Sequence, residues 1–167
     1  MSSIELHAAH RDELPIIENL MQFYTHDFSE WLPLPLGEQG LFDLRPLEDY
    51  WRSPATRPFL IRVDGELAGF VTLDDQTHLP GAHYNMGYLF VSRRFRGQGV
   101  GRFVVSTLLS RFPGQWQIFH LAANPSARLF WAAVMPALCA SGFSQSELEV
   151  ECNPCTFYQF ESSPRPS

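Results

Sequence analysis

Hydrophobic positions recur with helical spacing in three segments of the chain and with strand-like patterns in the segments between them. Apolar side chains three and four residues apart predict amphipathic helices at residues 12–24, 100–112 and 125–135. Alternating or continuous apolar runs predict strands at residues 4–6, 59–63, 67–73, 84–91, 116–121, 143–151 and 156–160. The stretch 25–58 follows no regular period, apart from a short helix expected near 47–52, and long irregular stretches are often functional loops.

The order of these elements predicts an α/β (α+β) fold built on one mixed sheet. Asp64-Gly65 lies between two apolar runs and predicts a hairpin. Strand–helix–strand units follow, so we expect a mixed central sheet of about six to seven strands with helices on both faces. The run 84–91 is almost entirely apolar from Met86 on, which predicts a central strand buried on both faces. We expect a single domain over residues 1–161 and a disordered tail, rich in Pro and Ser, at 162–167.

Composition and charge narrow the class of protein. The chain has 167 residues, a net charge of −6 and no basic run, which argues against binding a nucleic-acid duplex or an anionic membrane. Its three cysteines do not indicate a disulfide framework. The first residues do not resemble a signal peptide, and the longest apolar stretch, 129–140, is interrupted by Pro136 and too short to cross a bilayer. We therefore expect a cytoplasmic protein.

A glycine-rich turn follows the apolar strand at 84–91 and precedes a predicted helix. It reads Arg96-Gly97-Gln98-Gly99-Val100-Gly101-Arg102, with Arg93 and Arg94 just before it. Glycines let the backbone approach a ligand, and the free N–H groups of a helix N-terminus favour an anion, so a phosphate or pyrophosphate is the expected occupant. The spacing differs from the dinucleotide fingerprint, and a chain without lysine cannot form a nucleoside-triphosphate P-loop. The alternative is a glycine-rich turn with solvated arginines.

Two motifs resemble the GNAT superfamily of N-acetyltransferases. The family's pyrophosphate loop has the pattern Q/R-x-x-G-x-G/A, which Arg96–Gly101 matches at every fixed position. A second block resembles the family pattern N-x-x-A-x-x-F-Y … G-F and comprises Asn124, Ala127, Phe130, Trp131 and Gly142-Phe143. The clear resemblance covers residues 59–143, and the order of predicted elements extends it to most of the chain.

The resemblance implies that acetyl-CoA is the co-substrate, with no metal, and that the acetyl group passes directly to an amine in a ternary complex. The diphosphate would lie on the backbone N–H groups of residues 98–103, the pantetheine arm would pair with the strand edge at 89–91, and Asn124 would reach the arm. The implied CoA-binding residues are Leu89, Phe90, Val91, Arg96, Gly97, Gln98, Gly99, Val100, Gly101, Arg102, Phe103 and Asn124.

The chain departs from the family pattern at both acid–base positions. Members often carry a tyrosine acid where this chain has Trp131, and a glutamate base on the strand that here contains no carboxylate. Tyr88, His83 and His120 are the candidate replacements, since a phenol can donate a proton and imidazole suits base catalysis near neutral pH. The alternatives are a packed tyrosine and two structural histidines. A non-catalytic CoA-binding or regulatory module, or a binder of another phosphate ligand, therefore remains open.

The segment after the first predicted helix contains aromatic and acidic residues that suit a cationic acceptor. Tyr24, Asp27, Glu30 and Trp31 are the expected acceptor-binding residues, through cation–π contacts and charge pairing. Asp74 and Asp75 follow the hairpin, where they either flank the cleft or form a solvated turn. We expect a small-molecule amine acceptor of the acetyl group, and neither a nucleic-acid nor a membrane partner; a homodimer is left open.

Overall fold

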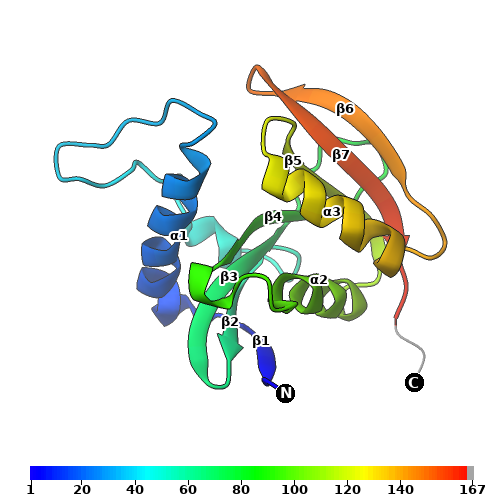
Figure 1. Ribbon diagram of the computed structural model, residues 1–167, viewed down its shortest axis with the longest axis horizontal. Helices are drawn as coiled ribbons and strands as arrows, with labels where there is room; N and C mark the ends of the chain where they lie inside the picture. Colours follow the sequence, from blue (N-terminus) through cyan, green and yellow to red (C-terminus); the bar gives the residue numbers. More distant parts are fainter. Residues whose placement is uncertain (165–167) are drawn as a thin grey trace.

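The computed structural model describes residues 1–164 and contains one seven-stranded mixed sheet (Figure 1). Along the chain the elements are β1 (Ile4–Ala8), η1 (Arg11–Glu13), α1 (Leu14–Phe28), η2 (Glu48–Trp51), β2 (Arg57–Val63), β3 (Glu66–Asp74), β4 (Tyr84–Val91), η3 (Arg93–Phe95), α2 (Val100–Arg111), β5 (Gly114–Leu121), α3 (Pro125–Leu138), β6 (Ser144–Val150) and β7 (Asn153–Ser162). The strand order is β1-β2-β3-β4-β5-β7-β6. The expected mixed sheet and its strand count are confirmed.

The helices cover both faces of the sheet, as the pattern predicted. α1 contributes Ile17 and Met21 to a cluster on one face, where they contact Phe70 and Phe90. α2 and α3 pack on the opposite face, where their apolar residues surround Trp116 together with the inward side chains of the strands. Burying one Val, Leu, Ile or Met side chain stabilises the fold by about 2 kcal/mol. The apolar stripe of each helix therefore holds it against the sheet.

The hairpin between β2 and β3 forms where Asp64-Gly65 predicted it. Both residues have positive φ, 51° and 82°, which the tight turn between twisted strands requires. At the C-terminal end of the chain, the last strand extends one residue into the segment 162–167 that we expected to be a disordered tail. Ser162 is the last residue of β7, and its hydroxyl donates to the carbonyl of Phe112 at 3.1 Å, so β7 continues into the stretch that we assigned to the tail. Residues 165–167 lie outside the described residues.

β4 and β5 form the parallel pair of the sheet, and this pairing is short. It covers Tyr84–Met86 on β4 and Trp116–Ile118 on β5, after which the two strands separate. The central position of β4 is confirmed. Its burial on both faces is not, because Gly87, Tyr88 and Leu89 are only half-buried. The half-buried stretch begins where β5 leaves β4, and this separation opens the cleft described below.

Within residues 1–164, no helix is both long enough and apolar enough to span a membrane. The same residues contain no group of His, Cys, Asp or Glu side chains placed to hold a metal ion. The three cysteines are free thiols, and burial raises the pKa of Cys139 to about 11.

Candidate active site

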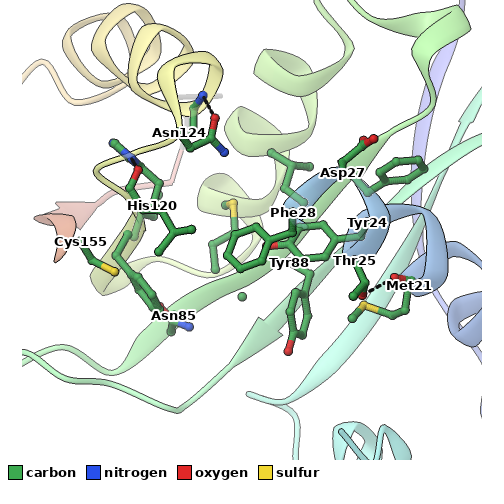
Figure 2. A pocket seen from close by; sticks show the side chains of 18 of the residues that line it. Met21, Tyr24, Thr25, Asp27, Phe28, Asn85, Tyr88, His120, Asn124 and Cys155 are labelled. Carbon is green, nitrogen blue, oxygen red and sulfur yellow. Dashed lines mark hydrogen bonds between the residues drawn. The ribbon is translucent and has the colours of Figure 1, made fainter. Parts of the chain in front are cut away.

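A cleft of about 1850 Å³ opens where β4 and β5 separate. The C-terminal half of α1 and the segment after it line one side, and the N-terminal ends of α2 and α3 line the other. Figure 2 shows the resulting arrangement, with Tyr24, Phe28 and Tyr88 grouped in the centre and His120 and Asn124 at the far side. The structure therefore brings the predicted donor segment and most of the predicted acceptor segment to one cavity.

The glycine-rich turn presents backbone amides to this cleft. Gly97 and Gly99 have φ values of 73° and 80°, a conformation that side chains with a Cβ rarely adopt. Gly99 is the N-cap of α2 and provides no side-chain cap, while the Phe103 amide bonds the Gly99 carbonyl at 3.0 Å. The amides of residues 100–102 precede that first helical bond, and these residues line the cleft. An uncapped helix N-terminus of this kind suits an anion.

α3 starts at the same cleft but satisfies its own N-terminus. The Oδ1 atom of Asn124 accepts a hydrogen bond from the Ala127 amide at 3.0 Å (Figure 2). Asn124 therefore caps α3 with its carbonyl oxygen, a role that Asn commonly takes before a Pro at the first helical position. Its amide nitrogen has no hydrogen-bond partner within residues 1–164 and is free to donate to a ligand.

The arginines of the turn are distributed differently from the sequence expectation. The Arg94 guanidinium turns away from the cleft and donates to Glu66 at 2.6 Å. Arg96 donates to Asp27 at 2.6 Å and to the Val91 carbonyl at 2.7 Å. Arg102 is exposed and lines the cleft, with no carboxylate in ion-pair distance within residues 1–164. Arg96 and Arg102 are thus the arginines of the G-x-G-x-G segment that face the donor side.

The strand edge expected to receive the pantetheine arm is free of strand partners. Leu89, Phe90 and Val91 line the cleft, and β5 pairs with β4 only before this stretch. β4 also carries one extra residue opposite Thr72, a bulge at Gly87-Tyr88 that interrupts the pairing with β3. The bulge lies at the point of separation, where it turns the strand toward the cleft.

Three predicted residues do not take part in the cleft through their side chains. His83 is exposed at the opposite end of β4 and does not line the cavity. The Gln98 side chain donates back to the Arg94 carbonyl at 2.8 Å, which closes the turn. Phe103 is 38% exposed on the outer surface of α2. A position near a strand end or helix start did not by itself decide which way these side chains point.

The predicted acceptor residues are only partly brought together. Tyr24 stacks on Phe28 with ring centroids 5.5 Å apart and meets Tyr88 edge-on at 5.1 Å. Burial raises the pKa of Tyr24, so its phenol stays protonated at neutral pH. Asp27 is not a free anion, because Arg96 and Arg93 occupy its carboxylate at 2.6 and 3.4 Å. Asp27 therefore links α1 to the glycine-rich turn, and a cation–π role remains for Tyr24.

Glu30 and Trp31 lie at the outer end of this side. Both line the cleft; Glu30 is exposed, while the Trp31 side chain packs beside the buried Leu121 and Phe157.

The two remaining acid–base candidates differ in their surroundings. Tyr88 lines the cleft, and burial raises the pKa of its phenol. His120 is buried on β5; its Nδ1 lies 2.9 Å from the Leu121 carbonyl, and its Nε2 has no hydrogen-bond partner within residues 1–164. Trp131, at the family's tyrosine position, is buried against Phe130 in α3. Tyr88 thus has the more open path to a reacting group.

Sequence reasoning missed a buried polar network under the cleft. Asp74 is 7% exposed and accepts a hydrogen bond from Asn85, which in turn accepts one from Gln117. Asp75, by contrast, turns outward and pairs with Arg52 at 2.7 Å. The available signal was polar residues at inward positions of three strands, but the pairing of those strands was needed to bring them together.

Comparison with known proteins gives a consistent result. A model of the acetyltransferase (GNAT) family matches residues 17–134. No curated protein matches the chain. Among solved structures, a GNAT-family acetyltransferase from Bacillus cereus is 17% identical with a TM-score of 0.64, covering 96% of this chain and 99% of that one.

Two further solved structures hold ligands. Spermidine N-acetyltransferase from Vibrio cholerae, in complex with CoA and spermine, is 15% identical with a TM-score of 0.63 and covers 95% of each chain. Naa50 from Arabidopsis thaliana, in complex with a bisubstrate analogue, is 16% identical with a TM-score of 0.58, covering 94% of this chain and 97% of that one. At these identities the likeness concerns the fold.

Proposed function

Because the chain belongs to the acetyltransferase (GNAT) family, we propose that it transfers the acetyl group of acetyl-CoA to a primary amine of a small molecule. The transfer is direct, in a complex that holds both substrates. The observation that carries the proposal is the uncapped N-terminus of α2, which lies beside Arg102 in the cleft and offers backbone donors to a diphosphate. The free thiols suit a reducing compartment, and we propose the cytoplasm.

Each structural element on the donor side binds a different part of acetyl-CoA. The amides of residues 100–102 and the Arg102 guanidinium hold the diphosphate, whose charge the dipole of α2 also stabilises. The unpaired β4 edge at residues 89–91 binds the amides of the pantetheine arm, and the Asn124 amide nitrogen donates to the same arm. The thioester then lies at the bulge. The Tyr88 amide donates to Thr72 Oγ1 at 2.8 Å, so a neighbouring β4 amide stabilises negative charge on the thioester oxygen.

The cleft holds the acceptor by shape and charge on the α1 side. The rings of Tyr24, Phe28 and Tyr88 form an aromatic wall there, a surface that suits an ammonium group. The neighbouring spermidine N-acetyltransferase from Vibrio cholerae is in complex with CoA and spermine, which supports an amine acceptor here. Holding the two reactants in one cavity supplies much of the rate enhancement.

A second candidate is a CoA-binding module without catalysis. It is favoured by the absence of the family's tyrosine, replaced by the buried Trp131, and of a carboxylate on β4. The two candidates differ in turnover and share donor binding.

Gly99→Glu tests the donor site, with Gly65→Glu as its matched control. Both glycines have φ near 80° and open space around a Cβ, but Gly65 lies in the β2–β3 turn, remote from the cleft. We expect Gly99→Glu to weaken acetyl-CoA binding more than about 100-fold in calorimetry, because its carboxylate occupies the anion site. Gly65→Glu should bind like wild type. Equal affinity of both variants for acetyl-CoA would contradict the proposal. A wild-type protein that binds ATP but not CoA would contradict it too.

Thiol release from acetyl-CoA with a panel of primary amines then separates the two candidates. Turnover of any amine supports the transferase, whereas donor binding without turnover supports the module.

A further inference from the structure

The C-terminal end of β3 brings a carboxylate to the point where β4 and β5 separate. Gly87 is the first β4 residue beyond the pairing with β5. A Cβ at Gly87 would lie 2.5 Å from Oδ2 of Asp74 and 2.6 Å from Oγ1 of Thr72. Any side chain at Gly87 would collide with these atoms. The absence of one therefore lets the carboxylate of Asp74 lie over β4 at the inner end of the cleft, which Asp74 lines.

Asp74 lies on the acceptor side of the sheet. Phe70, Thr72 and Asp74 are spaced two residues apart along β3 and therefore point to the same face, where Phe70 packs in the cluster beneath α1. The helices α2 and α3 pack on the opposite face. We place the thioester between the separated strands, where it enters from the α2 side. The carboxylate of Asp74 then approaches it from the α1 side of the sheet.

The orientation of the carboxylate is fixed by a chain of buried amides. Oδ1 of Asp74 accepts hydrogen bonds from the Gln76 amide at 2.9 Å and from Asn85 Nδ2 at 3.0 Å. Oδ1 of Asn85 accepts from Gln117 Nε2 at 3.0 Å, and Oε1 of Gln117 accepts two backbone amides of the segment 78–79. Oδ2 of Asp74 has no hydrogen-bond partner within residues 1–164. One oxygen is thus committed to the protein and the other is left for a ligand.

Within residues 1–164, none of the charged and titratable groups around Asp74 forms an ion pair with its carboxylate. They are Asp75 at the end of β3, Arg52 and Tyr50 from the segment around η2, and Tyr88 on β4. Arg52 pairs with Asp75 at 2.7 Å. Burial raises the pKa of Asp74, against the opposing effect of the two hydrogen bonds to Oδ1. A buried carboxylate without a partner cation is a good receptor for an ammonium group and a stronger base than an exposed one.

We propose that Asp74 binds the ammonium group of the acceptor and takes the proton that must leave before the nitrogen can attack, a role that Gly87 makes possible. The inference rests on the proposed acetyl transfer. Oδ2 of Asp74 accepts one N–H of the ammonium and takes that proton, which leaves a neutral amine. The nitrogen bonds to the thioester carbon, and the C–S bond breaks with its electron pair on sulfur.

The remaining protons complete the step. A second proton leaves the nitrogen and ends on the CoA sulfur, and the proton on Asp74 passes to water. The products are an amide, CoA as its thiol, and one proton. The acceptor class is a primary ammonium group that reaches Asp74 past the rings of Tyr24 and Tyr88, which Figure 2 shows to the right of Asn85 in the same cavity.

Asp74→Asn tests this role, with Asp75→Asn as the control, because Asp75 lies outside the cleft. Asparagine keeps the Oδ1 acceptor for Gln76 and Asn85 and removes the base. We expect kcat/KM to fall at least about 100-fold for amines that are cations at the assay pH. The loss should shrink for weakly basic amines and at high pH, where the amine is already neutral. Asp75→Asn should stay within about threefold of wild type, a range typical of a lost surface ion pair.

Two other measurements keep the test informative if a variant is poorly folded. Because the folded-state pKa of Asp74 is raised, its ionisation opposes folding as pH rises, so Asp74→Asn should melt no lower than wild type at pH 8. Gly87→Ala keeps the carboxylate but places a methyl 2.5 Å from Oδ2, and should lower kcat/KM at least about tenfold for amines that are cations at the assay pH.

The outcomes separate the two proposals. A wild-type protein that turns over no amine would overturn the proposed function. Turnover in which Asp74→Asn matches wild type, or loses the same factor for every amine at every pH, would overturn the role of Asp74 alone.

Discussion

The donor side and the acceptor side of the cleft are built from different parts of the chain. The donor side is mainly backbone: uncapped amides at the start of α2 and an unpaired edge of β4. The acceptor side is made of side chains that come from α1, β3 and β4, among them Tyr24, Asp74 and Tyr88. A shared co-substrate can be recognised by geometry that a short motif encodes, whereas an acceptor is recognised by residues far apart in sequence.

The two sides also satisfy their polar groups differently. At the donor side, Gly99 leaves the α2 N-terminus without a side-chain cap, so its first amides are available to a ligand. At the acceptor side, the Gln76 backbone amide and the Asn85 side-chain amide satisfy one oxygen of Asp74 and leave the other. Each side therefore keeps a specific polar group free for its own substrate. Three changes to single side chains test how independent the two sides are.

Tyr24→Leu should have the largest effect of the three and should act on the acceptor side alone. Losing the ring removes a partly desolvated cation–π attraction, which is worth about 1.5 kcal/mol, so KM for the amine should rise about tenfold. Acetyl-CoA affinity should not change. Phe23→Leu is the control, since Phe23 is exposed on the same helix and does not line the main cleft. An equal change in acetyl-CoA affinity would show that the aromatic wall belongs to the donor side.

Asn124→Ala should affect stability and the donor side together. The variant loses the α3 cap, which should lower the free energy of unfolding by about 1 kcal/mol in chemical denaturation. It also loses the amide donor to the pantetheine arm, so acetyl-CoA affinity should fall about fivefold. Asn124→Asp separates the two effects, because a carboxylate still caps the helix but donates no hydrogen bond. Wild-type affinity in both variants would mean that Asn124 serves α3 only.

Asp27→Asn should have the smallest effect of the three. It breaks the ion pairs that join the two sides, and ion pairs with exposed arginines contribute little energy. It releases Arg96 and Arg93 for the diphosphate, so acetyl-CoA should bind about threefold more tightly at low salt, with the gain shrinking as salt is added. Glu66→Gln is the control, since it releases Arg94, which faces away from the cleft. Weaker binding in Asp27→Asn would indicate that the ion pair holds Arg96 in its binding position.

Sequence patterns predicted the donor side better than the acceptor side. The loop Arg96–Gly101 is contiguous, and a helix that follows a glycine turn fixes where its amides point, so the structure forms the uncapped turn that was expected. Asp27 was expected to face the acceptor. Its partner Arg96 lies 69 residues away, so no local pattern could reveal the ion pair.

The contact between Asp74 and Gly87 was also beyond local reasoning. It depends on the bulge that shifts the register of β3 against β4, and a one-residue shift changes which side chains meet. Likewise His83 was chosen from its place in a predicted strand, but it lies at the end of β4 that is remote from the separation. The positions of the strands along the chain were predictable from hydrophobicity, whereas their limits and register were not.

A crystal structure of the complex with CoA tests the central claim most directly. The account predicts the diphosphate within hydrogen-bond distance of the backbone nitrogens of residues 100–102, the pantetheine arm along residues 89–91, and the sulfur beside Gly87, across β4 from Asp74. A diphosphate bound elsewhere, with the α2 N-terminus in contact with solvent or with side chains of the protein, would contradict it.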